Sequence, residues 1–150
     1  MLIAFDFGIT NTDIGVMQND HVSFFSFPSS AEKLTNNTIV HLLEKINISI
    51  SEISKIGVTG GKSSDLNNSL NLIEICKVNE IDAIGLGAKK LYKLLDESCL
   101  VISAGTGTAC VHVQGYQFNH LGGIAVGGGM LEGLGSLLFN NHHGLEINEY

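Results

Sequence analysis

Three glycine-rich segments, each of which follows an apolar run, constrain the possible folds of this chain most strongly. They are Asp6–Thr12 (DFGITNT), Gly105–Thr108 (GTGT) and Gly127–Gly135 (GGGMLEGLG). Glycine allows a backbone to turn tightly and to approach another group closely. Apolar runs that stop at such segments predict buried strands that end in turns. Three such turns in one short chain indicate a domain that binds phosphate groups through backbone amides.

The order of the expected elements predicts an α/β fold with a mixed central sheet and flanking helices. The expected strands cover residues 2–5, 13–17, 22–27, 53–59, 72–76, 99–103, 109–113 and 118–126, and the expected helices cover residues 34–46, 81–95 and 130–139. The first three strands form a meander, and the later strands alternate with helices. A chain of 150 residues is expected to form one domain, here residues 1–150.

Charge and composition exclude several classes of function. The chain has 15 acidic and 8 basic residues, a net charge of -7, which argues against binding nucleic acid or an anionic membrane. No apolar run reaches the length of a membrane span, and the first apolar run, which stops at Asp6, is no signal peptide. Cys76, Cys99 and Cys110 have no CxxC spacing, so we expect reduced, mostly buried thiols in a cytoplasmic protein.

The first glycine-rich segment is a candidate phosphate-binding turn. Gly8 lets the backbone approach a phosphate, and Thr10 adds a hydroxyl next to the amides of the turn. Asp6, at the end of the preceding strand, is a candidate ligand of Mg²⁺, directly or through water. The alternative is a simple hairpin turn in which Asp and Asn side chains bond their own backbone.

The second and third glycine-rich segments are candidates for the same task. Gly105, Thr106 and Gly107 lie between two apolar strands, where the alternative is a tight hairpin. Gly127, Gly128 and Gly129 precede an expected helix, whose first amides and positive dipole end favour an anion. Gly133 and Gly135 are unfavourable inside that helix unless another backbone packs closely against it.

A sequence similar to a P-loop occurs around Lys62 but has the wrong spacing. The P-loop pattern requires a glycine at position 56, where this chain has Ile56, and Gly57 gives a loop one residue too short. The residues after Ser63 are rich in Asn and Ser and do not predict a helix. We therefore expect no genuine P-loop there.

In this order, several motifs resemble those of type II pantothenate kinases. They are DFGITNTDIGV, GVTGG, NEIDAIGLGA, AGTGTACVHVQG and HLGGIAVGGGMLEGLGSLL, of which the last is the most specific. The resemblance covers nearly the whole chain but only the first part of the usual family length. It implies an actin-like ATPase fold related to ribonuclease H, with residues 1–150 as the phosphate-binding domain and the C-terminal nucleoside-binding domain absent from this chain.

The resemblance also implies an activity, the transfer of phosphate from ATP to the hydroxyl of pantothenate, the first step of coenzyme A biosynthesis. It implies ATP and Mg²⁺ as cofactors and a homodimeric enzyme. Carried over by motif, Gly8, Thr10, Gly105, Thr106 and Gly107 face the phosphates, Asp6 lies near the metal, and Gly127–Gly129 present amides to the nucleotide. Glu80 matches the catalytic glutamate, which acts as a base. The alternative for Glu80 is a solvated acid at the start of a helix.

Four positions depart from the family pattern. Ile9 and Asp13 stand where the family has a glycine and a lysine, and Ala109 replaces a serine that contacts substrate in some members. His120 stands at the position of a substrate-binding arginine, whose two-pronged contact with a carboxylate histidine cannot reproduce. Together with Thr106, His120 is a candidate substrate-binding residue. These departures leave two alternatives open: a kinase of another small alcohol or sugar, and a nucleotide-binding protein without transferase activity.

Overall fold

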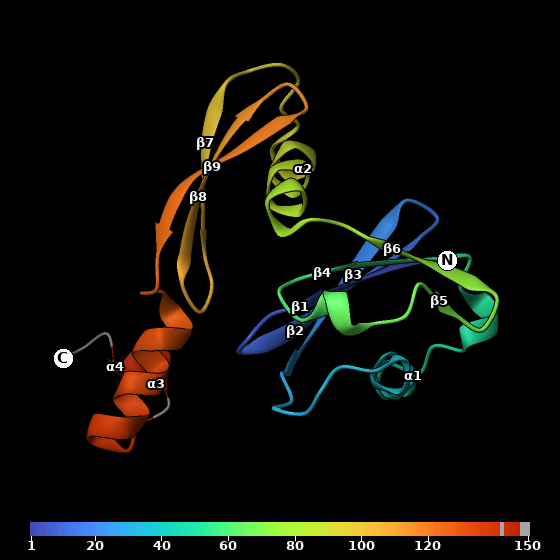
Figure 1. Ribbon diagram of the computed structural model, residues 1–150, viewed down its shortest axis with the longest axis horizontal. Coiled ribbons are helices and arrows are strands. Elements are labelled where there is room, and N and C mark those ends of the chain that lie inside the picture. The colour runs from blue at the N-terminus through green and yellow to red at the C-terminus, as the bar shows by residue number, and fades with distance from the viewer. Residues whose placement is uncertain (142, 148–150) are drawn as a thin grey trace. The chain divides into compact units, whose positions relative to one another are not determined.

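The computed structural model describes residues 1–141 and 143–147, which divide into two compact units, Met1–Glu80 and Ile81–Tyr150. Figure 1 labels the helices and strands of both units. The expectation that residues 1–150 form one phosphate-binding domain stays a prediction. Within the described residues, no helix has the length and apolar character needed to cross a membrane.

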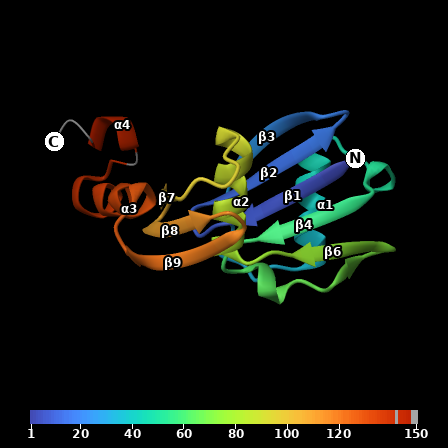
Figure 2. The same cartoon turned by 90° about the horizontal axis from the view of Figure 1, so that it is seen from above.

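A six-stranded mixed sheet forms the first unit, with the strand order β3-β2-β1-β4-β6-β5 (Figure 2). Its strands are β1 (Leu2–Phe7), β2 (Asn11–Gln18), β3 (His21–Pro28), β4 (Lys55–Thr59), β5 (Ser69–Leu70) and β6 (Ile73–Lys77). The first three strands form the expected antiparallel meander, and β1, β4 and β6 run parallel to one another. The expectation of a mixed sheet is therefore confirmed.

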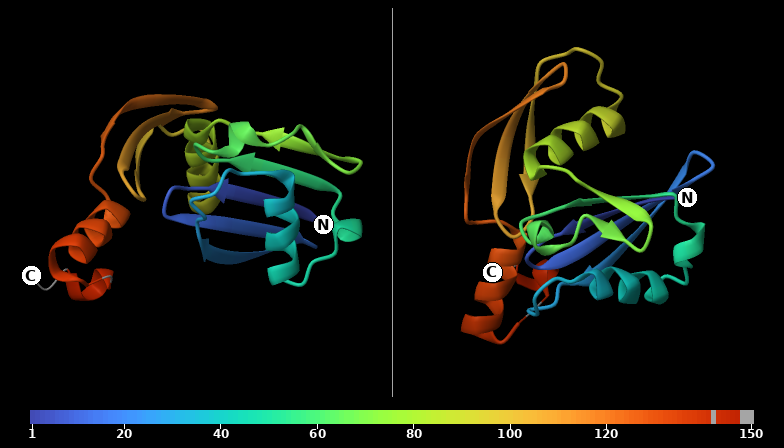
Figure 3. Two further views of the ribbon diagram at one scale, coloured as in Figure 1. Left: turned by 60° about the horizontal axis from the view of Figure 1, so that its bottom comes forward. Right: turned by 45° about the vertical axis from the view of Figure 1, so that its right-hand side comes forward.

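Helix α1 (Asn36–Lys45) covers one face of this sheet (Figure 3). The alternation of apolar side chains along the strands explains which face is covered, because Ile3, Phe5 and Phe7 of β1 are buried while the residues between them are exposed. From the helix, Ile39, Leu42 and Leu43 complete this core. The opposite face of β1 carries Leu2, Ala4 and Asp6.

Among its described residues, the second unit contains a three-stranded antiparallel meander and three helices, the first of which begins at Glu80, the last residue of the first unit. The strands are β7 (Cys99–Ala104), β8 (Thr108–Gln114) and β9 (Gln117–Ile124), and the helices are α2 (Glu80–Tyr92), α3 (Gly128–Phe139) and the short α4 (Gly144–Ile147). Val111 and Val113 of β8 are fully buried. A β-carbon on Gly85 of α2 would collide with the Phe118 ring, so glycine is needed for α2 to pack against β9.

Two smaller expectations need correction or qualification. The three cysteines are free, but Cys76 is exposed, and Cys99 and Cys110 are only partly buried. Cys76 lies on the sheet face that α1 does not cover, because the neighbouring Ile75 points toward the core. A P-loop would be followed by an α-helix after Lys62, but the structure has only a 3₁₀ helix of 3 residues there, Ser63–Asp65. This agrees with the expectation that the segment is no P-loop.

Candidate functional site

Three acidic residues lie near one another at the edge of the first unit where β1, β4 and β6 end. Asp6 pairs with Asp13 across the β1–β2 ladder, so both side chains are on the face opposite α1. Glu80 follows β6 and is the first residue of α2. The carboxyl ends of parallel strands meet at one edge of a sheet, which is the usual place for a ligand site in α/β folds.

The electrostatics of Asp6 indicate that these three carboxyl groups influence one another. Burial raises the pKa of Asp6 above its ordinary value of 3.8, and the negative charges of Glu80 and Asp13 raise it further. A cation placed between these groups would remove this repulsion and favour the ionised form. Sequence analysis predicted Asp6 and Glu80 separately, and the structure brings them together.

The chemistry of these acids fits a magnesium ion that keeps part of its water shell. Magnesium prefers oxygen ligands and is commonly held by one or two carboxylates together with substrate phosphates. Among the described residues, no group of three or more His, Cys, Asp or Glu side chains is arranged to hold a metal ion. Asp6 alone stays a candidate to share Mg²⁺ with phosphate and water, and Glu80 lies close enough to raise its pKa.

The turn between β1 and β2 is fixed by Ser29 at the end of the meander. Ser29 Oγ donates to the carbonyl of Gly8 at 2.8 Å, and the Ser29 amide donates to the carbonyl of Thr10 at 2.8 Å. A β-carbon on Gly8 would stand 2.6 Å from the carbonyl oxygen of Asn11, which explains the glycine. The turn is thus a tight, braced loop that begins two residues after Asp6.

Gly60 is a residue of this site that the sequence analysis did not select. It has φ +91°, a conformation that favours glycine, and a β-carbon there would stand 2.5 Å from the Phe7 carbonyl oxygen. The motif GVTGG, which is part of the family resemblance, carried the signal, but it assigned no role to Gly60. Next to it, the buried Thr59 Oγ1 has no hydrogen-bond partner among the described residues. Thr59 is the β-ladder partner of Asp6, so this hydroxyl belongs to the same edge.

In the second unit, the two other glycine-rich segments lie against each other. The amides of Gly129 and Met130, at the start of α3, donate to the carbonyls of Gly105 and Thr106, each at 3.2 Å. A β-carbon on Gly127 would stand 2.6 Å from the Gly105 carbonyl oxygen. The glycines therefore let the β7–β8 turn contact the start of the helix. One of the amides predicted to face the nucleotide, that of Gly129, is bonded to this turn.

The candidate substrate-binding residues His120 and Thr106 also belong to the second unit. His120 is exposed on β9, opposite Val111 of β8, and Thr106 lies in the β7–β8 turn. Ala109 follows this turn on β8 and pairs with Ser103. The predicted site residues thus form two groups, one in each unit, with Asp6, Gly8, Thr10 and Glu80 in the first. Their roles stay predictions.

Comparisons with known proteins support the resemblance that the motifs indicated. A type II pantothenate kinase from Staphylococcus haemolyticus is 36% identical over 110 residues, which cover 71% of this chain and 40% of that protein. Another, from Staphylococcus saprophyticus, is 33% identical over 93 residues, or 58% of this chain and 34% of that protein. The chain spans about a third to two fifths of the length of the curated relatives it matches. No protein-family model matches the chain.

Solved structures are similar to the chain over most of its length. The activator of the 2-hydroxyisocaproyl-CoA dehydratase from Clostridium difficile, with bound ADPNP, has a TM-score of 0.65 at 14% identity. The match covers 92% of this chain and 52% of the activator chain. A protein assigned as an N-acetylglucosamine kinase from Porphyromonas gingivalis has a TM-score of 0.60 at 21% identity. That match covers 93% of this chain and 57% of the Porphyromonas chain. The actin-like ATPase fold, related to ribonuclease H, is thereby confirmed.

Proposed function

We propose that this chain, which resembles type II pantothenate kinases in sequence and actin-like ATPases in fold, contributes to ATP-dependent phosphorylation of a small alcohol, with pantothenate as the leading candidate acceptor. The observation that carries the proposal is the grouping of Asp6, Asp13 and Glu80 at the carboxyl edge of the sheet, beside the braced Gly8 turn. Phosphoryl transfer depends mainly on positioning and on neutralising charge. This edge offers a metal-binding carboxylate, a base and a backbone turn.

Each residue of this edge has a separate proposed role. Asp6 holds Mg²⁺ together with water and phosphate oxygens, and the bound ion supplies charge neutralisation. Gly8 and Thr10 hold the phosphates through the turn that Ser29 braces. Glu80 accepts the proton of the acceptor hydroxyl as a general base.

In the second unit, the turn at Gly105–Gly107 and the start of α3 at Gly127–Gly129 are proposed to bind the nucleotide. Because Gly129 and Met130 already donate to the Gly105 turn, we propose that these segments act as one preassembled element. Thr106 and His120 are proposed to contact the acceptor. Histidine is a weaker carboxylate partner than arginine, so an acceptor other than pantothenate is the first alternative.

An assay with ATP, Mg²⁺ and a panel of small alcohols tests the proposal. ADP release that depends on pantothenate supports a pantothenate kinase, and release that depends on another alcohol or a sugar identifies a different acceptor. ATP binding without turnover for any acceptor supports the second alternative, a nucleotide-binding protein without transferase activity. The replacement of the family lysine by Asp13 motivates that alternative, because an acid near the phosphates opposes their charge.

A further inference from the structure

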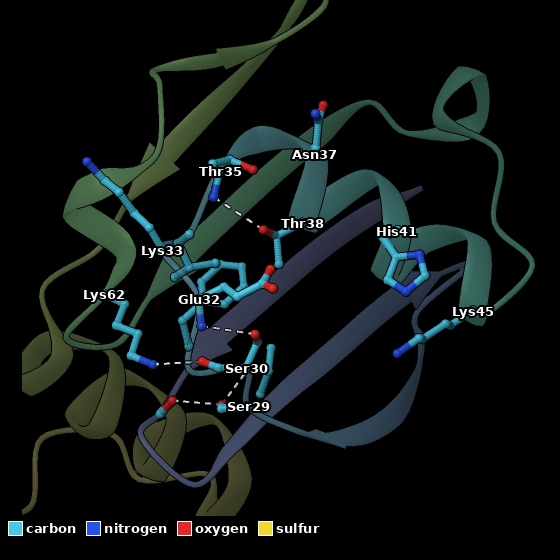
Figure 4. Close-up of a pocket in the computed structure, with 14 residues that line it drawn as sticks. Ser29, Ser30, Glu32, Lys33, Thr35, Asn37, Thr38, His41, Lys45 and Lys62 are labelled. Carbon is cyan, nitrogen blue, oxygen red and sulfur yellow. Dashed lines mark hydrogen bonds between the residues drawn. The ribbon is translucent and has the colours of Figure 1, made fainter.

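A second candidate site lies on the other face of the first unit. A cavity of about 550 Å³, partly open to solvent, is lined by α1, the segment between β3 and α1, the β1–β2 turn and Lys62 (Figure 4). Phe7 and Thr12 point into it, whereas Asp6 and Asp13, their neighbours along the strands, point to the opposite face. The sheet separates the cavity from the side chains of Asp6 and Asp13, whereas the Gly8 turn, which is proposed to hold the ATP phosphates, also lines the cavity.

The lining of this cavity is cationic although the chain as a whole is acidic. Lys33, Lys45 and Lys62 are three of the chain's 8 basic residues, and they line the cavity together with a single acid, Glu32. With a net charge of -7 over the whole chain, such a concentration of lysine is unexpected for an ordinary surface hollow. The local charge favours an anionic ligand.

Two of these lysines make specific contacts with their neighbours. The ammonium of Lys62 donates to the carbonyl of Ser30 at 3.0 Å, which uses one of its three donors. Lys45 extends from α1 with its ammonium 5.5 Å from the centroid of the Phe27 ring. Lys33 lines the cavity too, but its side chain extends away from Ser30 and Lys62 (Figure 4).

Hydroxyl groups between these lysines add neutral donors. Ser30 Oγ accepts the Glu32 amide at 3.1 Å, and Thr38 Oγ1 accepts the Thr35 amide at 3.2 Å. In each case the oxygen is held in place while its proton can point to a ligand, because a hydroxyl both accepts and donates. Lysine is a common point-charge partner of phosphate. We propose that this cavity binds a small phosphorylated metabolite, at a site distinct from the acidic edge.

The test is a titration of the isotope-labelled chain with glycerol 3-phosphate, followed by backbone NMR shifts, with glycerol as the uncharged control. The proposal predicts saturable shifts at residues 29–38 and at Lys62 with glycerol 3-phosphate and none with glycerol. Added salt weakens the binding, because the charges are partly exposed. Lys62→Ala and Lys45→Gln each weaken it about tenfold, the effect expected from losing one charge-assisted contact.

The matched control is Lys90→Ala on the exposed side of α2, which keeps the same change in net charge and leaves the affinity unchanged. Unchanged spectra elsewhere in the first unit show that each variant folds. The proposal is overturned if glycerol 3-phosphate gives no saturable shifts, or if the shifts centre on Asp6 and Glu80. It is also overturned if Lys62→Ala and Lys45→Gln bind as tightly as the Lys90→Ala control.

Discussion

A β-carbon built on Gly60 would stand 2.8 Å from Oδ1 of Asp6, so the loop after β4 lies directly against the carboxyl group at the end of β1. This approach is closer than carbon and oxygen atoms tolerate, and the backbone carbonyl oxygen of Phe7, which would stand 2.5 Å from the same β-carbon, cannot move without disturbing β1. Gly60 therefore fixes the position of Asp6. The arrangement depends on the absence of a side chain at this residue.

Gly60→Ala is expected to destabilise the first unit. The positive φ alone costs a residue with a β-carbon about 1–2 kcal/mol, and the contact with Phe7 adds to this. Hydrogen exchange of the β1 and β4 amides measures the effect in this unit. The neighbouring Gly61→Ala is the control, because a β-carbon on Gly61 would meet nothing within 4 Å. Equal protection in the two variants would contradict the interpretation.

The raised pKa of Asp6 predicts how the first unit responds to pH. Because the folded-state pKa lies above the ordinary value of 3.8, the folded protein binds the proton more tightly than the unfolded chain does. The free energy of unfolding therefore falls as pH rises from the unfolded pKa through the folded pKa. Asp6→Asn, which carries no charge, should lose this decrease and be more stable than the parent at neutral pH.

Hydrogen exchange checks the Asp6 prediction by measuring unfolding of the parent and the variant at a series of pH values. The series runs from 3.5 to neutrality, so that it includes the ordinary pKa of 3.8. Asp65→Asn is the control, because Asp65 lies in the 3₁₀ helix after Lys62 and no pairing connects it to Asp6 or Glu80. If Asp6→Asn keeps the parent's pH dependence, another group is responsible. Added Mg²⁺ should also reduce the dependence in the parent, because a bound cation favours ionised Asp6.

Sequence periodicity was sufficient for most of the fold but not for the site. The alternation of Ile3, Phe5 and Phe7 predicts β1 and its buried face, and the structure confirms it. The contact between Gly60 and Asp6 could not be predicted, because it depends on the register of the parallel strands β1 and β4, which are about fifty residues apart in the chain. The lysine-lined cavity was missed for the same reason, since Lys62 and Lys45 belong to different elements.

The contact between the two glycine-rich segments of the second unit leads to a paired prediction within one short region. Gly127→Ala should destabilise this unit by about 1–3 kcal/mol, because its β-carbon would stand 2.5 Å from the Gly107 carbonyl oxygen. Gly133→Ala should stabilise it by about 0.4–1 kcal/mol, because alanine is the better helix former and nothing lies within 4 Å.

Tyrosine fluorescence during urea unfolding measures both changes, because Tyr92 and Tyr116 belong to the second unit and the chain has no tryptophan. Gly135 shows why position matters within this helix: a β-carbon there would collide with Ile147 of α4. Gly135→Ala should therefore destabilise the unit although its helix propensity improves. If Gly127→Ala leaves the midpoint unchanged or raises it, as Gly133→Ala should, the close contact with the β7–β8 turn is wrong.

The catalytic role proposed for Glu80 leads to a prediction that separates chemistry from binding. Glu80→Gln keeps the shape of the side chain and removes its basic carboxylate, so turnover should fall about 10²- to 10⁴-fold, the range of general base catalysis. Affinity for ATP should stay nearly unchanged, because the proposed role concerns the acceptor hydroxyl. Steady-state turnover with the accepted alcohol and direct titration with ATP measure the two quantities on the same preparation.

The alternative role of Glu80, a solvated acid at the first residue of α2, predicts the opposite pattern. Turnover would stay at the parent level, while the free energy of unfolding would fall by about 0.3–1 kcal/mol, the usual value of an acid at a helix N-terminus. Glu80→Gln also removes one of the charges that raise the pKa of Asp6. The pH dependence that Asp6 causes should therefore move toward lower pH in this variant. That shift confirms that the two carboxyl groups interact whichever catalytic role holds, and its absence would refute the grouping on which the proposed site rests.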